Sequence, residues 1–271
     1  MVPPLVLVDL DDTLFQSARK SPPAEAKHLT LAAEAANGHH SYATRAQTNL
    51  FRWLSETAEV VPVTARGSGA FARVRLPFRN GAVLANGAVV LLPDRKVDAA
   101  WRAEVARGLT DARSDLDLLL NRGRQIALEA GLQLRSWIVE EDGIGAYTVF
   151  KDNIDENGAG LAILADALAP PAGWSVHRNS NNMAYIPACI SKRLACERLV
   201  TGARRSDPGR LVVGIGDSVS DFGFMALCDL IATPSRGQLA ELFAVIYAEK
   251  DAKPGSVHRL TARLNDPSSA L

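Results

Sequence analysis

Carboxylates that could take part in chemistry are concentrated at two points of the chain, and both clusters follow runs of aliphatic residues. Asp9, Asp11 and Asp12 lie in the segment DLDDT, and Asp217 and Asp221 lie four residues apart in GDSVSD. Carboxylates can act as nucleophiles, as general acids and bases, or as ligands of cations that prefer oxygen. Taken alone, the first cluster can also be an acidic turn that caps the next helix.

Two further polar residues have comparable positions. Thr64 ends a Val-rich run in VPVTAR, and Lys192 opens a helical pattern in SKR. Taken singly, Thr64 can be a helix cap, Lys192 a solvated lysine and Asp217 a turn residue. These structural interpretations leave one fact unexplained, because Asp9, Thr64 and Asp217 all end short aliphatic runs.

Those aliphatic runs are predicted to be buried strands of one parallel sheet. Leu5–Asp9, Glu59–Thr64 and Leu211–Gly216 are short and rich in Val and Leu, and helical patterns lie between them. This alternation is typical of a parallel sheet covered by helices, in which ligands bind beyond the carboxyl ends of the strands. The other expected helices are Pro22–Asn37, Tyr42–Thr57, Arg66–Arg73, Ser191–Thr201, Phe222–Leu227 and Arg236–Phe243. Further strands are expected at Ala82–Leu92, with an interruption at Asn86-Gly87, and at Leu230–Thr233. A last element is expected at Ser256–Leu264.

The middle of the chain has a different pattern. It predicts a long helix over Asp98–Gly131, paired strands, a helix over Glu156–Ala167, and a second strand pair. We therefore expect an α/β protein with a doubly wound, Rossmann-like parallel-sheet core and an inserted α+β domain of order αββαββ. Residues 1–86 and 188–271 are expected to form the core, and residues 87–187 the inserted domain. The predicted strands of the insert are Leu132–Glu140, Gly145–Lys151, Ser175–Asn179 and Met183–Pro187.

Composition excludes several classes of protein. The 271 residues include 30 Lys or Arg and 30 Asp or Glu, so the zero net charge argues against nucleic acid or an anionic membrane as the main partner. The apolar run Val2–Val8 is too short for a signal peptide or a membrane span. Three cysteines without CxxC spacing indicate free thiols in a reducing compartment. A cytoplasmic protein is therefore expected.

In order and spacing, the four motifs together resemble those of the haloacid dehalogenase-like hydrolases, specifically their phosphatase branch. DLDDT is similar to the first motif, VT in VPVTAR to the second, Lys192 in SKR to the third and GDSVSD to the fourth. An insert between the second and third motifs, entered through the NGA of Asn86–Ala88, resembles the large cap domain of the Cof-type and sucrose-phosphatase-like subgroup. The resemblance covers the whole chain.

The resemblance implies a role for each core motif residue. Asp9 would be the nucleophile that forms an aspartyl-phosphate, and Asp11 the general acid and then the base. Thr64 would donate its hydroxyl to a phosphate oxygen, and Lys192 would bridge Asp9 and the phosphate. Asp12 occupies a variable position of the first motif and is expected to be non-catalytic.

The resemblance also implies a magnesium site. Asp9, the backbone carbonyl of Asp11, and Asp217 would bind Mg²⁺, and Asp221 would complete or support the site. A cation is also expected on electrostatic grounds, because one lysine cannot hold four converging carboxylates and a phosphate together. Ser220 stands where the subgroup usually has Asn, so we expect altered geometry around the metal and retained activity.

Substrate specificity is expected to come from the cap, with a sugar phosphate as the substrate class that the subgroup suggests. Trp137 is either part of the cap's core, which we favour, or a platform for substrate. The predicted substrate- and phosphate-binding residues are Thr64, Arg66, Lys192, Asn86, Arg178 and Asn181, with Lys151 and Asn182 as further polar candidates on the cap.

Two other functions remain open from the sequence. A phosphotransferase or phosphomutase of the phosphomannomutase type would pass the phosphoryl group to a sugar hydroxyl, where a phosphatase passes it to water. A catalytically silent binding protein on the same fold is the third hypothesis, and the intact motif residues argue against it. The expected partner is a small-molecule phosphate ester, with no nucleic acid and no membrane, and the expected state is a monomer or homodimer.

Overall fold

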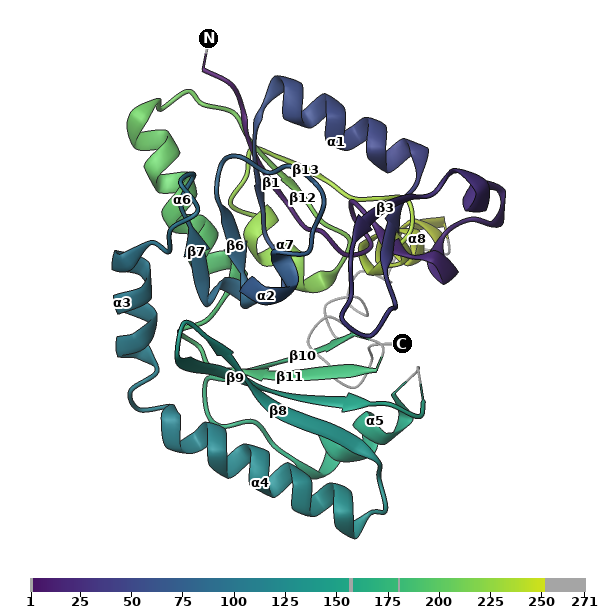
Figure 1. Ribbon diagram of the computed structural model, residues 1–271, viewed down its shortest axis with the longest axis vertical. Helices are drawn as coiled ribbons and strands as arrows, with labels where there is room; N and C mark the ends of the chain where they lie inside the picture. Colours follow the sequence, from purple (N-terminus) through teal and green to yellow (C-terminus); the bar gives the residue numbers. More distant parts are fainter. Residues whose placement is uncertain (1, 156–157, 180, 252–271) are drawn as a thin grey trace.

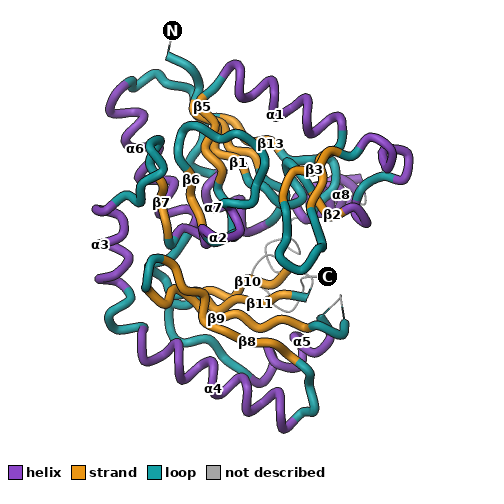
Figure 2. The backbone as a smooth tube through the Cα atoms, in the orientation of Figure 1, coloured by secondary structure: helices purple, strands orange, loops and turns teal. Residues whose placement is uncertain are grey.

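A four-stranded parallel sheet lies in one half of the protein, drawn uppermost in Figures 1 and 2, and the second half contains a separate sheet. The computed structural model describes residues 2–155, 158–179 and 181–251. The strand order is β5–β1–β12–β13, and every neighbouring pair is parallel. The strands are β1 (Leu5–Val8), β5 (Glu59–Pro62), β12 (Val212–Ile215) and β13 (Leu230–Ala232). The predicted α/β class is therefore confirmed.

Helices cover both faces of this sheet, as its sequence pattern predicts. Side chains alternate along β1, so Leu5 and Leu7 pack on one face, while Val6 and Val8 pack on the other. The first face is covered by α6 (Lys192–Ser206) and α7 (Val219–Met225), and the second by α1 (Arg45–Thr57). A strand buried on both faces is continuously apolar, which explains the short aliphatic runs. The remaining helices of the core are α2 (Ser68–Phe71) and α8 (Gln238–Asp251).

The predicted helix over Pro22–Asn37 is wrong. Only Pro23–His28 forms a 3₁₀ helix, and Thr30–Ala33 forms strand β3. Strand β3 pairs with β4 (Ser41–Ala43), which in turn pairs with β2 (Gln16–Ser17). Pairing of β3 buries Ala32 and Ala33 in the cluster beneath α1. The stabilisation from this burial and pairing outweighs the helix propensity of the alanines, which is a weak local preference.

A tight hairpin leads from the core toward the inserted domain. Strands β6 (Ala82–Leu84) and β7 (Val89–Leu91) are antiparallel, and a 3₁₀ turn over Ala85–Gly87 joins them, so the predicted interruption at Asn86-Gly87 is confirmed. Gly87 has a φ of 100°, and a Cβ atom there would lie 2.3 Å from the carbonyl oxygen of Ser191. The turn therefore contacts the residue before α6 directly.

The inserted segment forms a separate antiparallel sheet of order β10–β11–β9–β8. Figures 1 and 2 show this sheet facing the core, with helices α4 and α5 on its far side. The predicted order of helix, two strands, helix and two strands is confirmed. Its elements are α3 (Ala99–Gly108), α4 (Arg113–Glu129), β8 (Leu134–Glu141), β9 (Ile144–Asp152), α5 (Ala159–Ala167), β10 (Ser175–Asn179) and β11 (Asn182–Ile186).

One prediction about this segment needs correction. The single helix expected over Asp98–Gly131 is two helices, because α3 ends at Gly108 and α4 begins at Arg113. Leu109 and Ala112, between the two helices, are buried in the core cluster, so the apolar pattern continues through the bend. The residues of the predicted Ser256–Leu264 element lie outside the described part of the chain. Among the described helices, none is both long and apolar enough to cross a membrane.

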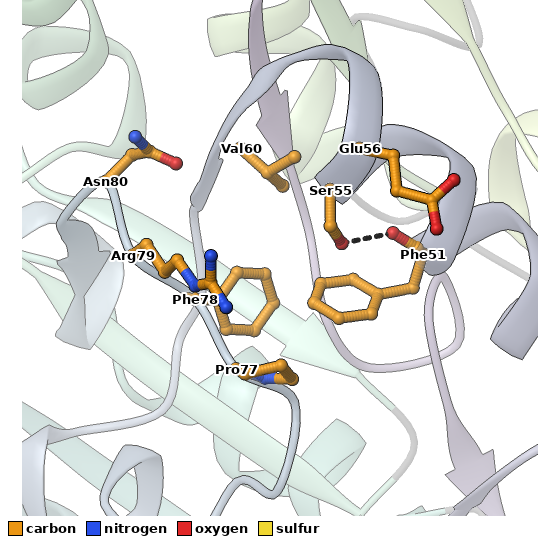
Figure 3. Close-up of a pocket in the computed structure, with 8 residues that line it drawn as sticks. All are labelled: Phe51, Ser55, Glu56, Val60, Pro77, Phe78, Arg79 and Asn80. Atoms are coloured by element: carbon orange, nitrogen blue, oxygen red, sulfur yellow. Dashed lines mark hydrogen bonds between the residues drawn. The ribbon is translucent and has the colours of Figure 1, made fainter.

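A small pocket of about 180 Å³ opens between α1 and the segment before β6 (Figure 3). The ring of Phe51 meets that of Phe78 edge-on beneath it, with 5.1 Å between centroids. The residues that line the pocket include none of the predicted site residues, so it is not a candidate for the chemistry.

Candidate active site

The first predicted carboxylate, Asp9, lies directly beyond the carboxyl end of β1. Its backbone N–H extends the pairing of β1 with β12 by donating to the carbonyl oxygen of Ile215 at 2.8 Å. Asp9 is therefore held beside the carboxyl end of β12. The side chain is buried, with 5% of the residue exposed. Burial raises the pKa of Asp9 well above its usual range, and the charge of Lys192 opposes this shift.

Lys192 connects two of the predicted carboxylates. It is the first residue of α6, where the side chain of Ser191 caps the helix by accepting from the N–H of Arg193. Its Nζ donates to Asp9 Oδ1 at 2.8 Å and to Asp221 Oδ1 at 2.7 Å. Burial lowers the pKa of Lys192, but the charges of the two carboxylates outweigh it and raise the pKa overall. Lys192 is therefore a buried cation shared between two acids.

Asp217 and Asp221 reach this point from the loop after β12 and from α7. Asp221 is fully buried, and its Oδ2 accepts from the N–H of Ser218 at 3.0 Å and from its hydroxyl at 2.7 Å. A Cβ atom on Gly216 would lie 2.5 Å from the Cβ of Asp221, so a glycine is needed where the two come together. Burial, followed by the charges of Asp221 and Asp12, raises the pKa of Asp217 to about 7.

These three acids have the composition and spacing of a divalent cation site. One oxygen from each of Asp9, Asp217 and Asp221 lies within 4.8 Å of the others. At such separations, each pair of charged carboxylates repels by about 3–4 kcal/mol at an effective dielectric of ~20. No side chain in the described ranges donates a hydrogen bond to Asp217, so Lys192 alone does not neutralise the group. Three buried carboxylates suit Mg²⁺, which takes oxygen ligands.

Asp11 lies in the same loop, but its side chain points to Arg66. The Nε and Nη2 atoms of Arg66 each donate to one oxygen of Asp11, both at 2.7 Å. Arg66 also donates to Ser41 Oγ at 3.2 Å and lies 5.0 Å above the ring of Phe15. The predicted contact of Arg66 with a phosphate therefore stays a prediction, and the structure places its guanidinium on Asp11. The part of Asp11 in a metal site likewise stays a prediction.

Thr64 and Asn86 lie together on the side of the site formed by β5 and β6. Thr64 is buried, its hydroxyl accepts from the N–H of Arg66 at 3.1 Å, and its carbonyl accepts from the N–H of Asn86 at 3.0 Å. The backbone of Asn86 is in the left-handed region, with a φ of 58°. Burial raises the pKa of Tyr147 in the inserted domain to about 12, and the side chain of Asn86 opposes this shift.

Arg178 and Asn181 are not brought to the buried carboxylates. Arg178 donates to the carbonyl of Gly158 at 2.8 Å and pairs across strands with Met183, whose side chain packs beneath the sheet with α4 and α5. Asn181 donates to the carbonyl of Asp152 at 2.9 Å. Both side chains thus stabilise connections within the inserted domain, and their contact with a substrate stays a prediction.

Three residues near the site were not singled out from the sequence. Glu141 accepts hydrogen bonds from the N–H of Ser68, the first residue of α2, at 3.0 and 3.2 Å. The hydroxyl of Tyr147 lies 3.4 Å from the carbonyl of Ala65. Burial and the charge of Lys192 lower the pKa of His177, while Asp221 opposes this. All three are in the inserted sheet, and no local motif in the sequence marks them.

Comparison with known proteins identifies the fold. No protein-family model and no curated protein sequence matches the chain. A sucrose-phosphatase from Synechocystis, solved in complex with sucrose and phosphate, superposes with a TM-score of 0.56 and 14% identity, over 90% of this chain and 87% of that one. The C-terminal domain of a trehalose-6-phosphate phosphatase from C. albicans superposes with a TM-score of 0.54 and 14% identity, over 92% and 78% respectively. The chain therefore has the fold of these two sugar-phosphate phosphatases, with a parallel-sheet core and an inserted cap, which is the fold that the four motifs predict.

Proposed function

We propose that this protein is a magnesium-dependent phosphatase that hydrolyses a small phosphorylated metabolite, in particular a sugar phosphate, through a phosphorylated Asp9. One observation carries the proposal. A buried carboxylate at the end of β1 shares a buried lysine with Asp221, and Asp217 adds a third acid to the group. A lysine beside the attacking carboxylate can bind the phosphoryl oxygens that would otherwise repel it.

In the proposed first step, an oxygen of Asp9 attacks phosphorus and the bond from phosphorus to the leaving oxygen breaks. Asp11 gives the leaving oxygen its proton. In the second step, Asp11 takes a proton from water, the water oxygen bonds to phosphorus, and the bond from phosphorus to Asp9 breaks. Asp9 is thereby regenerated and inorganic phosphate is released.

The neighbouring residues have supporting roles in this proposal. Lys192 and the hydroxyl of Thr64 would hold phosphoryl oxygens. Arg66 donates a hydrogen bond to each oxygen of Asp11, so one of these two hydrogen bonds must break before Asp11 can transfer a proton. Asp9, Asp217 and Asp221 would hold Mg²⁺, with Asp11 as a further proposed ligand. The metal would supply positive charge that screens the attacking carboxylate and orients the phosphate.

The class of substrate is taken from the two proteins compared above, since they are a sucrose-phosphatase and a trehalose-6-phosphate phosphatase. The inserted sheet that faces the site would bind the organic part of the ester and exclude water. The three cysteines are free, which fits our further proposal that the protein acts in the reducing cytoplasm.

The experiment is hydrolysis of p-nitrophenyl phosphate by the purified chain, with Mg²⁺ and with EDTA, beside an Asp9→Asn variant. We expect Mg²⁺-dependent release of phosphate that is lost in the variant. Asp94→Asn is the matched control, because Asp94 is exposed and pairs with Lys96, outside the proposed machinery. Equal activity of the Asp9→Asn variant would refute the proposal, and transfer of the phosphoryl group to an added sugar would favour the phosphotransferase.

A further inference from the structure

The two faces of the inserted sheet have different surroundings. On one face, Phe150 and Met183 pack with α4 and α5. The alternate residues, such as Val149 and Ala184, pack in the cluster shared with the core. Figure 1 shows the same division, with the core on one side of the sheet and both helices on the other. Side chains two residues before or after Val149 and Ala184 in the same strands therefore lie on the face of the sheet turned toward the core.

The strand register arranges the core-facing residues in rows. One row joins Trp137, Val149, Ala184 and His177, which are direct cross-strand partners. The neighbouring row joins Arg135, Lys151 and Asn182. The two cations of this row are thus directly opposite each other on adjacent strands, an arrangement in which like charges repel.

Neither cation of this row has a carboxylate partner within the described residues. Lys151 has no side-chain hydrogen bond or ion pair there. The guanidinium of Arg135 lies 5.5 Å from the centre of the Trp137 ring, a contact that holds the group in place and leaves its N–H donors available. Other arginines near the site are paired, as Arg66 is with Asp11 and Arg102 is with Asp142. An anion between Arg135 and Lys151 would remove their repulsion.

The row of Arg135 and Lys151 is placed to contact the end of a substrate that lies away from the reacting phosphate. Tyr147 contacts the core beside Thr64, and His177 experiences the charges of Lys192 and Asp221. The row of Arg135 and Lys151 follows the row of His177 by two residues, which is about 7 Å along a strand. A phosphate bound at Asp9 would therefore leave the organic part of the ester between the catalytic site and these cations.

We propose that Arg135 and Lys151 bind a second anionic group of the substrate, so that the preferred substrates are phosphate esters whose organic part carries a carboxylate or a second phosphate. This inference rests on the proposed phosphatase function. Guanidinium and ammonium groups on facing strands can each donate to one oxygen of such a group. Trp137 positions Arg135 by stacking, so the packing and platform roles considered for this tryptophan are compatible.

The test compares esters that differ in one charge. 6-Phosphogluconate and sorbitol 6-phosphate share an open six-carbon chain and differ only in a terminal carboxylate or alcohol. Fructose 1,6-bisphosphate and fructose 6-phosphate test a second phosphate in the same way. We expect the wild-type protein to have a higher kcat/KM for the acidic member of at least one pair. Preference for the acid in the first pair alone identifies a carboxylate site, and in the second pair alone a phosphate site.

The variants are Arg135→Gln, Lys151→Gln and the double variant, with Arg122→Gln as the control because Arg122 is exposed on α4, on the far side of the sheet. The double variant should lose about 10- to 100-fold in kcat/KM for the preferred acidic ester. Hydrolysis of the neutral ester and of p-nitrophenyl phosphate should stay within about twofold, since neither carries a second anionic group for the pair to bind. Thermal melts should show the double variant to have a stability close to that of wild type, because removal of the like-charge contact offsets loss of the Arg135–Trp137 contact.

Two outcomes would overturn the inference. One is equal kcat/KM for the acidic and neutral members of both pairs, and the other is an acidic preference that the double variant retains. Failure of the proposed function is recognised separately, by absence of Asp9-dependent hydrolysis of p-nitrophenyl phosphate. In that case calorimetric titration with 6-phosphogluconate and with sorbitol 6-phosphate still tests the proposed anion site. Wild-type protein, which has both Arg135 and Lys151, should bind 6-phosphogluconate more tightly than sorbitol 6-phosphate, and the double variant should not.

Discussion

The close approach of Gly87 to α6 makes a quantitative prediction about the position of Lys192. Gly87 lies at the end of the β6–β7 turn, with a φ of 100°, and a Cβ atom there would lie 2.3 Å from the oxygen and 2.5 Å from the carbon of the Ser191 carbonyl. The same atom would lie 3.0 Å from the backbone nitrogen of Lys192. All three contacts are with backbone, so Gly87→Ala cannot be accommodated by rotating a side chain.

The expected cost has two parts. A non-glycine residue in the left-handed region costs roughly 1–2 kcal/mol. Overpacking against a rigid neighbour adds typically about 1–3 kcal/mol. We therefore expect Gly87→Ala to lower the free energy of unfolding by about 2–5 kcal/mol. Because relief of the contact requires movement of the first turn of α6, Lys192 should also move away from Asp9 and Asp221.

Two other glycines separate these contributions. Gly131 has a φ of 67°, and no atom lies within 4 Å of the position that a Cβ would occupy. Gly131→Ala should therefore lower the free energy of unfolding by the conformational cost alone, about 1–2 kcal/mol. Gly202 lies in the middle of α6 with open space around it, and Gly202→Ala should stabilise the protein by up to about 1 kcal/mol. Urea denaturation measures all three variants.

Activity provides the second measurement. Under conditions where the protein is fully folded, Gly87→Ala should lower kcat for p-nitrophenyl phosphate, while Gly131→Ala and Gly202→Ala should leave it unchanged. The reasoning is refuted if Gly87→Ala destabilises the protein no more than Gly131→Ala does. It is also refuted if a strongly destabilised Gly87→Ala protein keeps full kcat when folded, since Lys192 would then be positioned independently of this contact.

Three further predictions concern the contact between Glu141 and Ser68 and the thiols of Cys196 and Cys228. Glu141→Gln should lower the free energy of unfolding by about 1–2 kcal/mol, because the acceptor for the N–H of Ser68 loses its charge. The control is Glu140→Gln, a change of the neighbouring residue. Equal urea denaturation curves for the two variants would contradict the contact between Glu141 and Ser68. Cys196 is fully buried and should react with a thiol reagent only after unfolding. Burial and Asp229 raise the pKa of Cys228 to about 11, so its labelling rate should rise with pH toward that value, and a rate that levels off near neutral pH would be inconsistent with this environment.

The core could be predicted from the sequence because the residues that mark each strand and the polar residue after it are close together in the chain. Each of Asp9, Thr64 and Asp217 follows a short strand, and the carboxyl ends of neighbouring parallel strands meet at one edge of the sheet whatever their exact register. The order of the cap elements was also predictable, because apolar periodicity and turn residues mark each element separately.

Errors arose where contacts distant in sequence decide the local structure. Residues 30–33 form a strand because they pair with β4 and bury two alanines beneath α1, and neither contact is visible in the segment itself. The bend between α3 and α4 has the same origin. Leu109 and Ala112 continue the apolar pattern because they are buried in the core cluster, so periodicity gives no sign that the helix axis changes there.

The pair of Arg135 and Lys151 shows why the proposed substrate-binding residues are harder to predict than the proposed reacting residues. Lys151 was a candidate from the sequence, but Arg135 was not, because its importance depends on lying opposite Lys151 across β8 and β9. A slip of one residue in that register would place one of the two cations on the face of α4 and leave the other alone. The bulge between Val139 and Glu140 lies in the same strand pair, so counting from the turn does not give the pairing of residues beyond it. Asp9, Thr64 and Asp217 converge through the topology of the parallel sheet, whereas this cationic pair exists only through the register of one strand pair.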